Sequence, residues 1–332
     1  MTNDTRTEGQ VGRYGTAVVN GPEGEDLDWY SIDWASVEDD VRRLRQRIFT
    51  ASQVGDLKQV RNLQKLMLRS RANALSSVRQ VTERNAGRMT AGIDGNVVVT
   101  APGKADLATW VQQHSDSWKP KPVKRVYIDK ANGKKRPLGI PVIFDRALQA
   151  HVVSALEPEW EARFEPKSYG FRPGRGCHDA IESIYKTVGG KAAQRLWVLD
   201  ADLAAAFDRI DHSYLLAALG TFPARELVEQ WLKAGVVEKG RLAPTGEGTP
   251  QGGVISPVLL NVALHGMEKA AGVRYRTVGI HAGKTMAGSP VVVRYADLCR
   301  YRHKSAHAEF RIMPRIGRTS SNRAGIARES SA

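Results

Sequence analysis

An aspartate stands at the end of a predicted apolar strand in the middle of the chain. The strand covers residues 196–203, LWVLDADL, and carries Asp202 near its end. A carboxylate at a strand end is a natural Mg²⁺ ligand, because this ion prefers hard oxygen donors and is usually bound by one or two carboxylates together with substrate phosphates. Asp208 and Asp211 follow shortly after, and helix capping is the simpler interpretation of these two residues.

A second aspartate ends another predicted strand. Residues 290–297, PVVVRYAD, are rich in β-branched residues, which favour a strand, and end at Asp297. If the two strands lie side by side, Asp202 and Asp297 come close together, and like charges at short range are costly unless cations neutralise them. A pair of metal ions would do so, and two metal ions suit phosphoryl transfer by in-line displacement.

Two further segments suit the binding of phosphates. Residues 248–257, GTPQGGVISP, predict a glycine-rich turn before a helix, where a ligand can approach the backbone. Residues 123–143 predict a β-hairpin whose tip, between Asp129 and Lys135, is crowded with basic residues. Each segment alone is a weak signal, since a solvated turn also explains the basic tip. P-loop and dinucleotide-binding glycine patterns are absent from the sequence.

The charge balance indicates a polyanionic partner. The 332 residues include 49 Lys and Arg against 35 Asp and Glu, a net charge of +14, which favours nucleic acid before a membrane. Two cysteines cannot form a disulfide framework, and no apolar run approaches the roughly 18 residues of a membrane span. These features exclude secreted disulfide-rich and membrane-embedded classes. For lack of targeting signals, we expect a cytoplasmic, nucleoid-associated protein.

The N-terminal part predicts a mobile leader over residues 1–33 and basic helices over 34–84. Apolar residues recur at helical spacing from Val37 onward, with Ser36 as the expected N-cap, and a second helix is expected to run over 56–84. One side of that second helix carries the basic residues Lys58, Arg61, Lys65, Arg69, Arg71 and Arg79. A solvated helix face and an RNA-facing surface are both consistent with them.

Taken in order, four blocks of the sequence resemble the reverse transcriptase, or maturase, encoded by group II introns. They are KRVYIDKANGKKRPLGIPVIFDRALQ (124–149), YGFRPGRGCHDAI (169–181), DADLAAAFDRIDH (200–212) and GTPQGGVISPVLLN (248–261). VRYAD (293–297) is similar to the first part of a fifth block, and the resemblance covers about residues 34–297.

The resemblance implies an α+β fold of the right-hand polymerase type, with fingers over 85–195 and a palm over 196–297 whose sheet is backed by helices. Asp202 and Asp297 would be the catalytic aspartates that bind Mg²⁺. The implied partners are an intron RNA template, a DNA primer or target, and deoxynucleotides, with no membrane.

Four more residues acquire roles from the same resemblance. Phe207 takes the place of the aromatic residue under the sugar, where a 2′-hydroxyl would clash, so that deoxynucleotides are selected. Gln251 matches the glutamine near the incoming nucleotide. Lys130 and Arg136 are candidates for holding its triphosphate.

The chain departs from the family pattern after Asp297. Relatives read Tyr-Ala-Asp-Asp, whereas Leu298 follows here, and the next residues carry too much charge for the expected second strand of a hairpin. Residues 298–332, with a net charge of +6, are therefore expected to be a disordered basic tail, as a shifted reading frame would produce, and the thumb is expected to be missing. The sequence predicts a truncated, impaired reverse transcriptase. The alternative is an RNA-binding, maturase-like splicing cofactor or an inactive remnant.

Overall fold

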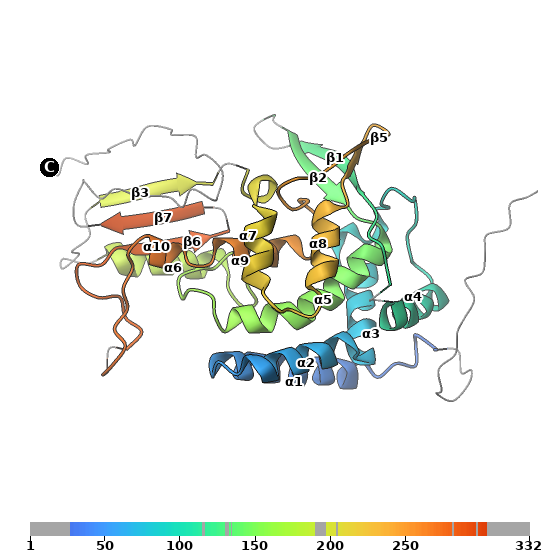
Figure 1. Cartoon of the computed structure of the whole chain (residues 1–332), viewed down its shortest axis with the longest axis horizontal. Coiled ribbons are helices and arrows are strands. Elements are labelled where there is room, and N and C mark those ends of the chain that lie inside the picture. Colours follow the sequence, from blue (N-terminus) through green and yellow to red (C-terminus); the bar gives the residue numbers. More distant parts are fainter. Residues whose placement is uncertain are drawn as a thin grey trace, which may run out of the picture.

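Helix α5, Ile143–Glu161, lies at the centre of the fold and is buried along most of its length. Most of the other helices gather around it, while a small sheet, with two helices beside it, lies at the far end of the molecule (Figure 1). The computed structural model describes residues 27–114, 117–129, 133, 135–189, 197–203, 205–280, 282–296 and 298–303, of which 197 and 298–303 are described by their backbone alone. No helix within these ranges is long and apolar enough to cross a membrane.

The N-terminal helices form a layer against α5. They are α1 (Trp34–Gln53), α2 (Leu57–Leu68), α3 (Arg71–Arg79) and α4 (Ala101–His114). The predicted apolar side of α1 is confirmed, since Val41, Leu44 and Ile48 are buried. The helix begins earlier than predicted, because the Asp33 carboxylate, and not Ser36, accepts the first free backbone N–H groups.

The predicted long helix over 56–84 is interrupted. The chain leaves α2 at Arg69, and the Ser70 side chain starts α3 by accepting a hydrogen bond from the backbone N–H of Asn73. A π-helical turn, Gln80–Arg84, and a 3₁₀ turn, Ala86–Met89, follow α3. The buried Asn73 amide also donates to the carbonyls of Met67 and His151, so this break is tied to α5.

A four-stranded mixed sheet covers one side of the helices. Its strands are β1 (Val123–Asp129), β2 (Lys135–Ile140), β4 (Val236–Glu238) and β5 (Arg241–Ala243), in the order β2-β1-β4-β5. The predicted hairpin is confirmed, because β1 and β2 pair antiparallel from Lys124↔Ile140 to Asp129↔Lys135. Strand β4 pairs parallel with β1, which brings a distant segment beside the hairpin.

Four helices lie between or beside the two sheets. They are α7 (His212–Leu219), α8 (Arg225–Lys233), α9 (Ser256–Leu264) and the short α10 (Met267–Ala270). Gly220, at φ +56°, and Gly266, at φ +93°, end the first helix of each pair with backbone angles that other residues rarely adopt.

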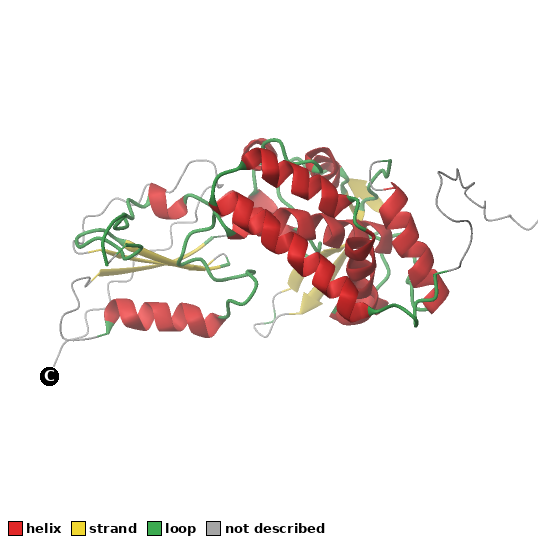
Figure 2. Cartoon of the chain, turned by 90° about the horizontal axis from the view of Figure 1, so that it is seen from below, coloured by secondary structure: helices red, strands yellow, loops and turns green. Residues whose placement is uncertain are grey.

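A three-stranded antiparallel sheet forms the other end of the molecule. Its strands β3 (Trp197–Asp202), β6 (Val291–Tyr295) and β7 (Leu298–His303) have the order β3-β7-β6. Helix α6 (Cys177–Val188) runs along one face, where Ala180 contacts the buried β6 residues (Figure 2). The apolar strand predicted over 196–203 is present as β3, but it lies at the edge of this sheet, and its Val198 is 47% exposed.

Strand β7 corrects the expected structure of residues 298–332. Residues 298–303 are not part of a disordered tail but form the central strand of this sheet, paired with β3 on one side and β6 on the other. Side-chain charge was the wrong criterion, because two neighbouring strands satisfy the backbone of a central strand whatever its side chains. Residues 304–332 lie outside the described residues.

The predicted boundary between fingers and palm at 195/196 does not separate the two sheets. Strands β4 and β5, from the predicted palm, complete the sheet of the hairpin, whereas α6, from the predicted fingers, covers the sheet of β3 and β6. These pairings join segments far apart in sequence, which local patterns do not encode. The predicted palm sheet also continues past residue 297 into β7.

Candidate active site

Asp202 lies at the carboxyl end of β3 with an exposed side chain. Its partner in the sheet is Leu298, which also pairs with Tyr295 on β6. The expectation that β3 and β6 lie side by side is therefore wrong, because β7 separates them. Asp297 lies outside the described residues, between Ala296, which the structure describes, and Leu298. The sheet register thus brings Asp202 opposite the residue that follows Asp297 in the sequence.

Phe207 lies on the 3₁₀ turn Ala206–Arg209 that follows β3, and its side chain is buried. Its ring makes an edge-to-face contact with Phe171, at 5.9 Å between centroids. The Phe207 carbonyl accepts a hydrogen bond from the backbone N–H of Thr249 at 2.6 Å. The segment after β3 is thus held directly against the glycine-rich turn.

That turn needs glycine where it meets the segment after β3. Gly248 has φ +82°, and a Cβ atom there would lie 2.6 Å from the Asp208 carbonyl oxygen. The Gly248 N–H donates to Ile210, and the Gly248 carbonyl lies 2.7 Å from Nε2 of the buried His212. His212 was not singled out from the sequence, and a lone histidine at a helix start gives no signal of this contact.

Two of the predicted nucleotide-binding residues meet at the hairpin. Arg136 on β2 donates from Nε to the Gln251 side-chain oxygen at 3.0 Å. The Gly139 N–H donates to the Gln251 carbonyl at 2.6 Å, so the turn is also anchored to β2 by its backbone. Lys130, the third predicted residue of this group, lies outside the described residues.

Asp208 faces the same hairpin. Burial raises the pKa of this half-buried carboxyl group, and the positive charge of Arg125 on β1 opposes the rise. Arg125 belongs to the basic hairpin of the sequence, but its approach to Asp208 depends on the folding of two distant segments and has no local signal. The hairpin, the glycine-rich turn and the segment after β3 therefore meet at one place.

A divalent cation would find few ligands in the described part of the chain. No group of three or more His, Cys, Asp or Glu residues within it could hold a metal ion. The exposed Asp202 carboxylate is the one predicted ligand that the structure describes, and its oxygens are accessible to a hydrated hard cation. The donor type fits Mg²⁺, and Asp297 would have to supply a second carboxylate.

Models of two protein families match the chain. The N-terminal domain of reverse transcriptase matches residues 29–111, and reverse transcriptase (RNA-dependent DNA polymerase) matches residues 128–310. Because the second model covers more than half of the 332 residues, the chain belongs to the reverse transcriptase family. The match continues through β7, in agreement with its place in the sheet.

Within this family the chain is related to proteins of group II introns, as the sequence blocks predicted. It is 39% identical over 212 residues to Protein YkfC of Escherichia coli (strain K12), covering 60% of this chain and 55% of YkfC. It is 38% identical over 193 residues to Group II intron-encoded protein LtrA of Lactococcus lactis subsp. cremoris, covering 56% of this chain and 31% of LtrA. The matches thus span about half of YkfC and a third of LtrA.

Among solved structures, a chain of the partial Cas6-RT-Cas1–Cas2 complex is 19% identical. The similarity covers 71% of this chain and 38% of that chain, with a TM-score of 0.40.

The buried carboxyl group of Glu268 should make the stability of the fold depend on pH. The Tyr275 hydroxyl donates to the buried Glu268 carboxylate on α10. Burial raises the pKa of Glu268 to about 7; nearby Glu165 adds to the rise, while the Tyr275 hydrogen bond and Lys167 oppose it. Because the folded chain retains this proton and the unfolded chain releases it near the ordinary value of 4.5, its stabilising effect should be complete below about pH 4.5 and lost by about pH 7.

Thermal melting of the wild type and Glu268→Gln across pH 4 to 8 measures this contribution. From pH 4.5 to 7 the melting temperature of the wild type should fall steadily relative to that of Glu268→Gln, and above that range the difference should level off. If the melting temperatures of the two proteins changed with pH in parallel, the pKa of Glu268 would not be raised in the folded chain.

Proposed function

We propose that the chain is the polymerising part of a group II intron reverse transcriptase, which adds deoxynucleotides to a DNA primer on an RNA template. The observation that carries the proposal is the sheet register of Asp202 opposite the residue after Asp297. The bond between Arg136 and Gln251, two residues expected at the incoming nucleotide, supports it. In this proposal residues 85–195 act as fingers and 196–303 as the palm. Strands β4 and β5 of the palm join the sheet of the fingers, and α6 of the fingers packs on the sheet of the palm.

The proposed chemistry is in-line displacement at phosphorus. The 3′-hydroxyl of the primer attacks the α-phosphate of a deoxynucleotide, and pyrophosphate leaves. Asp202 and Asp297 would hold Mg²⁺, which when bound lowers the pKa of the attacking hydroxyl and neutralises charge on the leaving group. Arg136, with Lys130, would hold the triphosphate through charge-assisted hydrogen bonds, and Phe207 would lie under the sugar.

The same register explains why we expect an impaired enzyme. Leu298, paired with both Asp202 and Tyr295, stands where relatives carry a further aspartate. Leucine can neither ligate a cation nor offset its charge. Two carboxylates without the third should hold the metal ions weakly, so catalysis should be slow.

Addition of a single nucleotide to a DNA primer on an RNA template, with Mg²⁺, tests the proposal. We expect slow addition of the deoxynucleotide and much slower addition of the matching ribonucleotide, because Phe207 would exclude the 2′-hydroxyl. Equal use of both sugars would contradict the role of Phe207. RNA binding without any addition, even after Leu298→Asp, would favour the second candidate function.

That second candidate is an RNA-binding, maturase-like splicing cofactor or an inactive remnant. Its support is the charge of +14 and the basic N-terminal helices. The proposed RNA-facing side is smaller than expected, because two of its arginines are paired with carboxylates of the chain: Arg61 with the buried Glu159, and Arg79 with the more exposed Glu38 and Glu83.

Binding to structured RNA should weaken steeply with salt under either candidate. Each phosphate contact releases counterions, so the logarithm of the affinity should fall by roughly 0.7 to 0.9 per contact for each log unit of salt. Filter binding at several salt concentrations gives the slope. Replacing the exposed Lys58 and Lys65 by glutamine should reduce it by about one to two contacts, and an unchanged slope would remove α2 from the RNA-binding surface.

A further inference from the structure

Phe171 has a backbone conformation and an exposure that do not suit a large aromatic residue. It lies in the loop between α5 and α6, and its φ of +58° falls in the left-handed region, which glycine, asparagine and aspartate tolerate better than bulky residues do. Phe171 is 45% exposed, so burial of its side chain offsets little of this strain. The stability of the fold therefore does not explain a phenylalanine at this position.

Strained backbone gathers around Phe171. Four non-glycine residues have a positive φ among the residues that the structure describes, and one of them lies in the turn between β4 and β5. The other three are Phe171, Ala205 and Ala296. Ala205 directly precedes the 3₁₀ turn that carries Phe207, and a Cβ atom at Gly170 would lie 2.1 Å from the Ala296 nitrogen. Strain of this kind is typical of places where function requires a particular backbone geometry.

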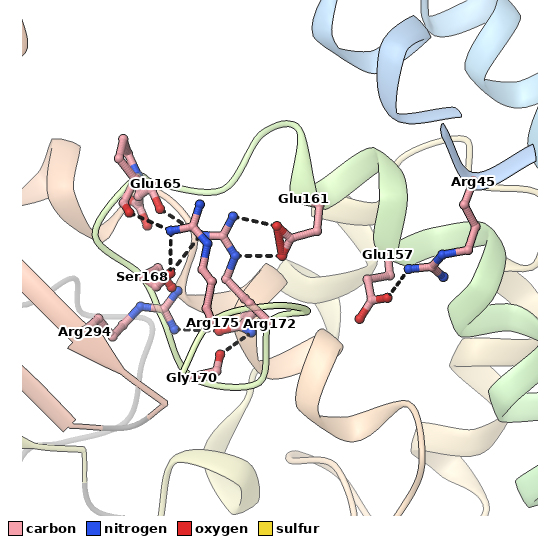
Figure 3. Close-up of polar contacts among 11 residues, drawn as sticks. Arg45, Glu157, Glu161, Glu165, Ser168, Gly170, Arg172, Arg175 and Arg294 are labelled. Atoms are coloured by element: carbon pink, nitrogen blue, oxygen red, sulfur yellow. Dashed lines mark hydrogen bonds and ion pairs between the residues drawn. The ribbon is translucent and has the colours of Figure 1, made fainter. Parts of the chain in front are cut away.

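The loop is held on both sides of Phe171. Before it, the Gly170 carbonyl accepts a hydrogen bond at 3.0 Å from the buried Asn261 amide on α9. After it, the buried Arg172 guanidinium donates to both carboxylate oxygens of Glu161 on α5, each at 2.7 Å (Figure 3). A residue between two such anchors cannot relax its backbone freely, so the loop imposes the left-handed conformation on Phe171.

The Phe171 ring is presented to the ring of Phe207. The two centroids are 5.9 Å apart and the planes are inclined at 69°, which is a favourable edge-to-face contact. Within the described part of the chain, Phe171 is the one aromatic residue in ring contact with Phe207. The Phe207 ring can exclude a 2′-hydroxyl only while it stays in place, so a neighbour on a rigid loop bears directly on that role.

We propose that Phe171 is a positioning residue for sugar selection, whose ring fixes the ring of Phe207 and so maintains discrimination against ribonucleotides. The inference rests on the proposed function, because it presumes that Phe207 lies under the sugar of the incoming nucleotide. Phe171 acts through Phe207 and takes no part in the chemical step. Loss of its ring leaves space into which the Phe207 ring can shift, and a 2′-hydroxyl is then accommodated.

Single-nucleotide addition by the full-length chain tests the inference. For the wild type and each variant, kcat/KM is measured for a deoxynucleotide and for the matching ribonucleotide, on the same primer and RNA template with Mg²⁺. The ratio of the two values is the sugar selectivity. A general loss of stability or activity lowers both values together, whereas displacement of the Phe207 ring changes their ratio.

Phe171→Asn is the most informative variant, because asparagine lacks the ring but tolerates the left-handed conformation. It should melt at the wild-type temperature or above, while its selectivity should fall by about two- to tenfold, the effect of losing one aromatic contact, mainly through faster ribonucleotide addition. Phe171→Leu, which is apolar but has no flat ring, should lose selectivity to a similar extent. Phe171→Tyr keeps the ring and should keep the selectivity. Tyr185→Leu, which removes an exposed aromatic ring from α6, is the matched control and should behave like the wild type.

The outcomes separate the inference from the proposed function. If the wild type prefers deoxynucleotides and Phe171→Asn keeps that preference unchanged, the positioning role is wrong while the role of Phe207 stands. If the wild type uses both sugars equally, or adds neither nucleotide, the proposed function fails in that respect and the inference fails with it. If Phe171→Leu does not melt cooperatively, Phe171→Asn and Phe171→Tyr decide, because equal selectivity in these two folded variants also overturns the role of the ring.

Discussion

Leu298→Asp should raise the rate of RNA-templated deoxynucleotide addition on the order of a hundredfold. The backbone of position 298 pairs with both Asp202 and Tyr295, so an aspartate there enters the sheet beside the proposed metal-binding residues. A preorganised charge at such a place is typically worth about 10² to 10³ in rate. The second strand of the hairpin already exists as β7, so the substitution does not have to create a fold.

Leu298→Asn is the matched control, since it has the same shape as aspartate without the charge. It should raise the rate far less than Leu298→Asp under the same Mg²⁺ concentration, measured by single-nucleotide primer extension. If Leu298→Asp is no faster than the unmodified chain, the missing carboxylate is not what limits this protein.

Glu159→Ala should lower the free energy of unfolding by about 3–5 kcal/mol, the usual effect of removing one partner of a buried ion pair. Glu159 lies on α5 and is 1% exposed. Its carboxylate accepts hydrogen bonds from Arg61 at 2.5 and 3.2 Å and from the fully buried Gln64 amide at 2.8 Å. The substitution leaves the buried Gln64 amide and the partly buried Arg61 guanidinium without their acceptor, so the contact between α2 and α5 weakens.

Glu157→Ala is the control on the same helix. Glu157 pairs with Arg45 on α1, but both side chains are more exposed, and such a pair contributes at most about 1 kcal/mol. Urea unfolding of the two variants should give midpoints that differ clearly. Equal small losses would show that the Arg61–Glu159 pair is not a main contact between the N-terminal helices and α5.

Sequence patterns predicted the elements whose signals are local. The β1–β2 hairpin was predicted over residues 123–143 with its tip between Asp129 and Lys135, and β6 was predicted from its β-branched residues. The family was predicted from ordered blocks, which no single element could have indicated.

The remaining features depend on contacts between distant segments. Strand β7 could not be predicted, because its charged residues are not typical of a central strand. Its strand conformation depends on backbone pairing with two distant segments, β3 and β6. Strand β4 pairs with β1 across more than a hundred residues, and Arg125 approaches Asp208 only in the folded chain. In the sequence, Arg294 is one polar residue in an otherwise apolar strand, and nothing local indicates that it is buried or that its partner is Asn261 on α9.

Nucleotide addition by this chain should depend on Asp202. The most direct measurement is addition of one deoxynucleotide to a primer on an RNA template with Mg²⁺, by the unmodified chain and by Asp202→Ala. We expect slow addition by the unmodified chain and none above background by Asp202→Ala. Asp39→Ala, which changes an exposed aspartate on α1, should behave like the wild type. Equal addition by the wild type and Asp202→Ala would contradict this dependence on Asp202.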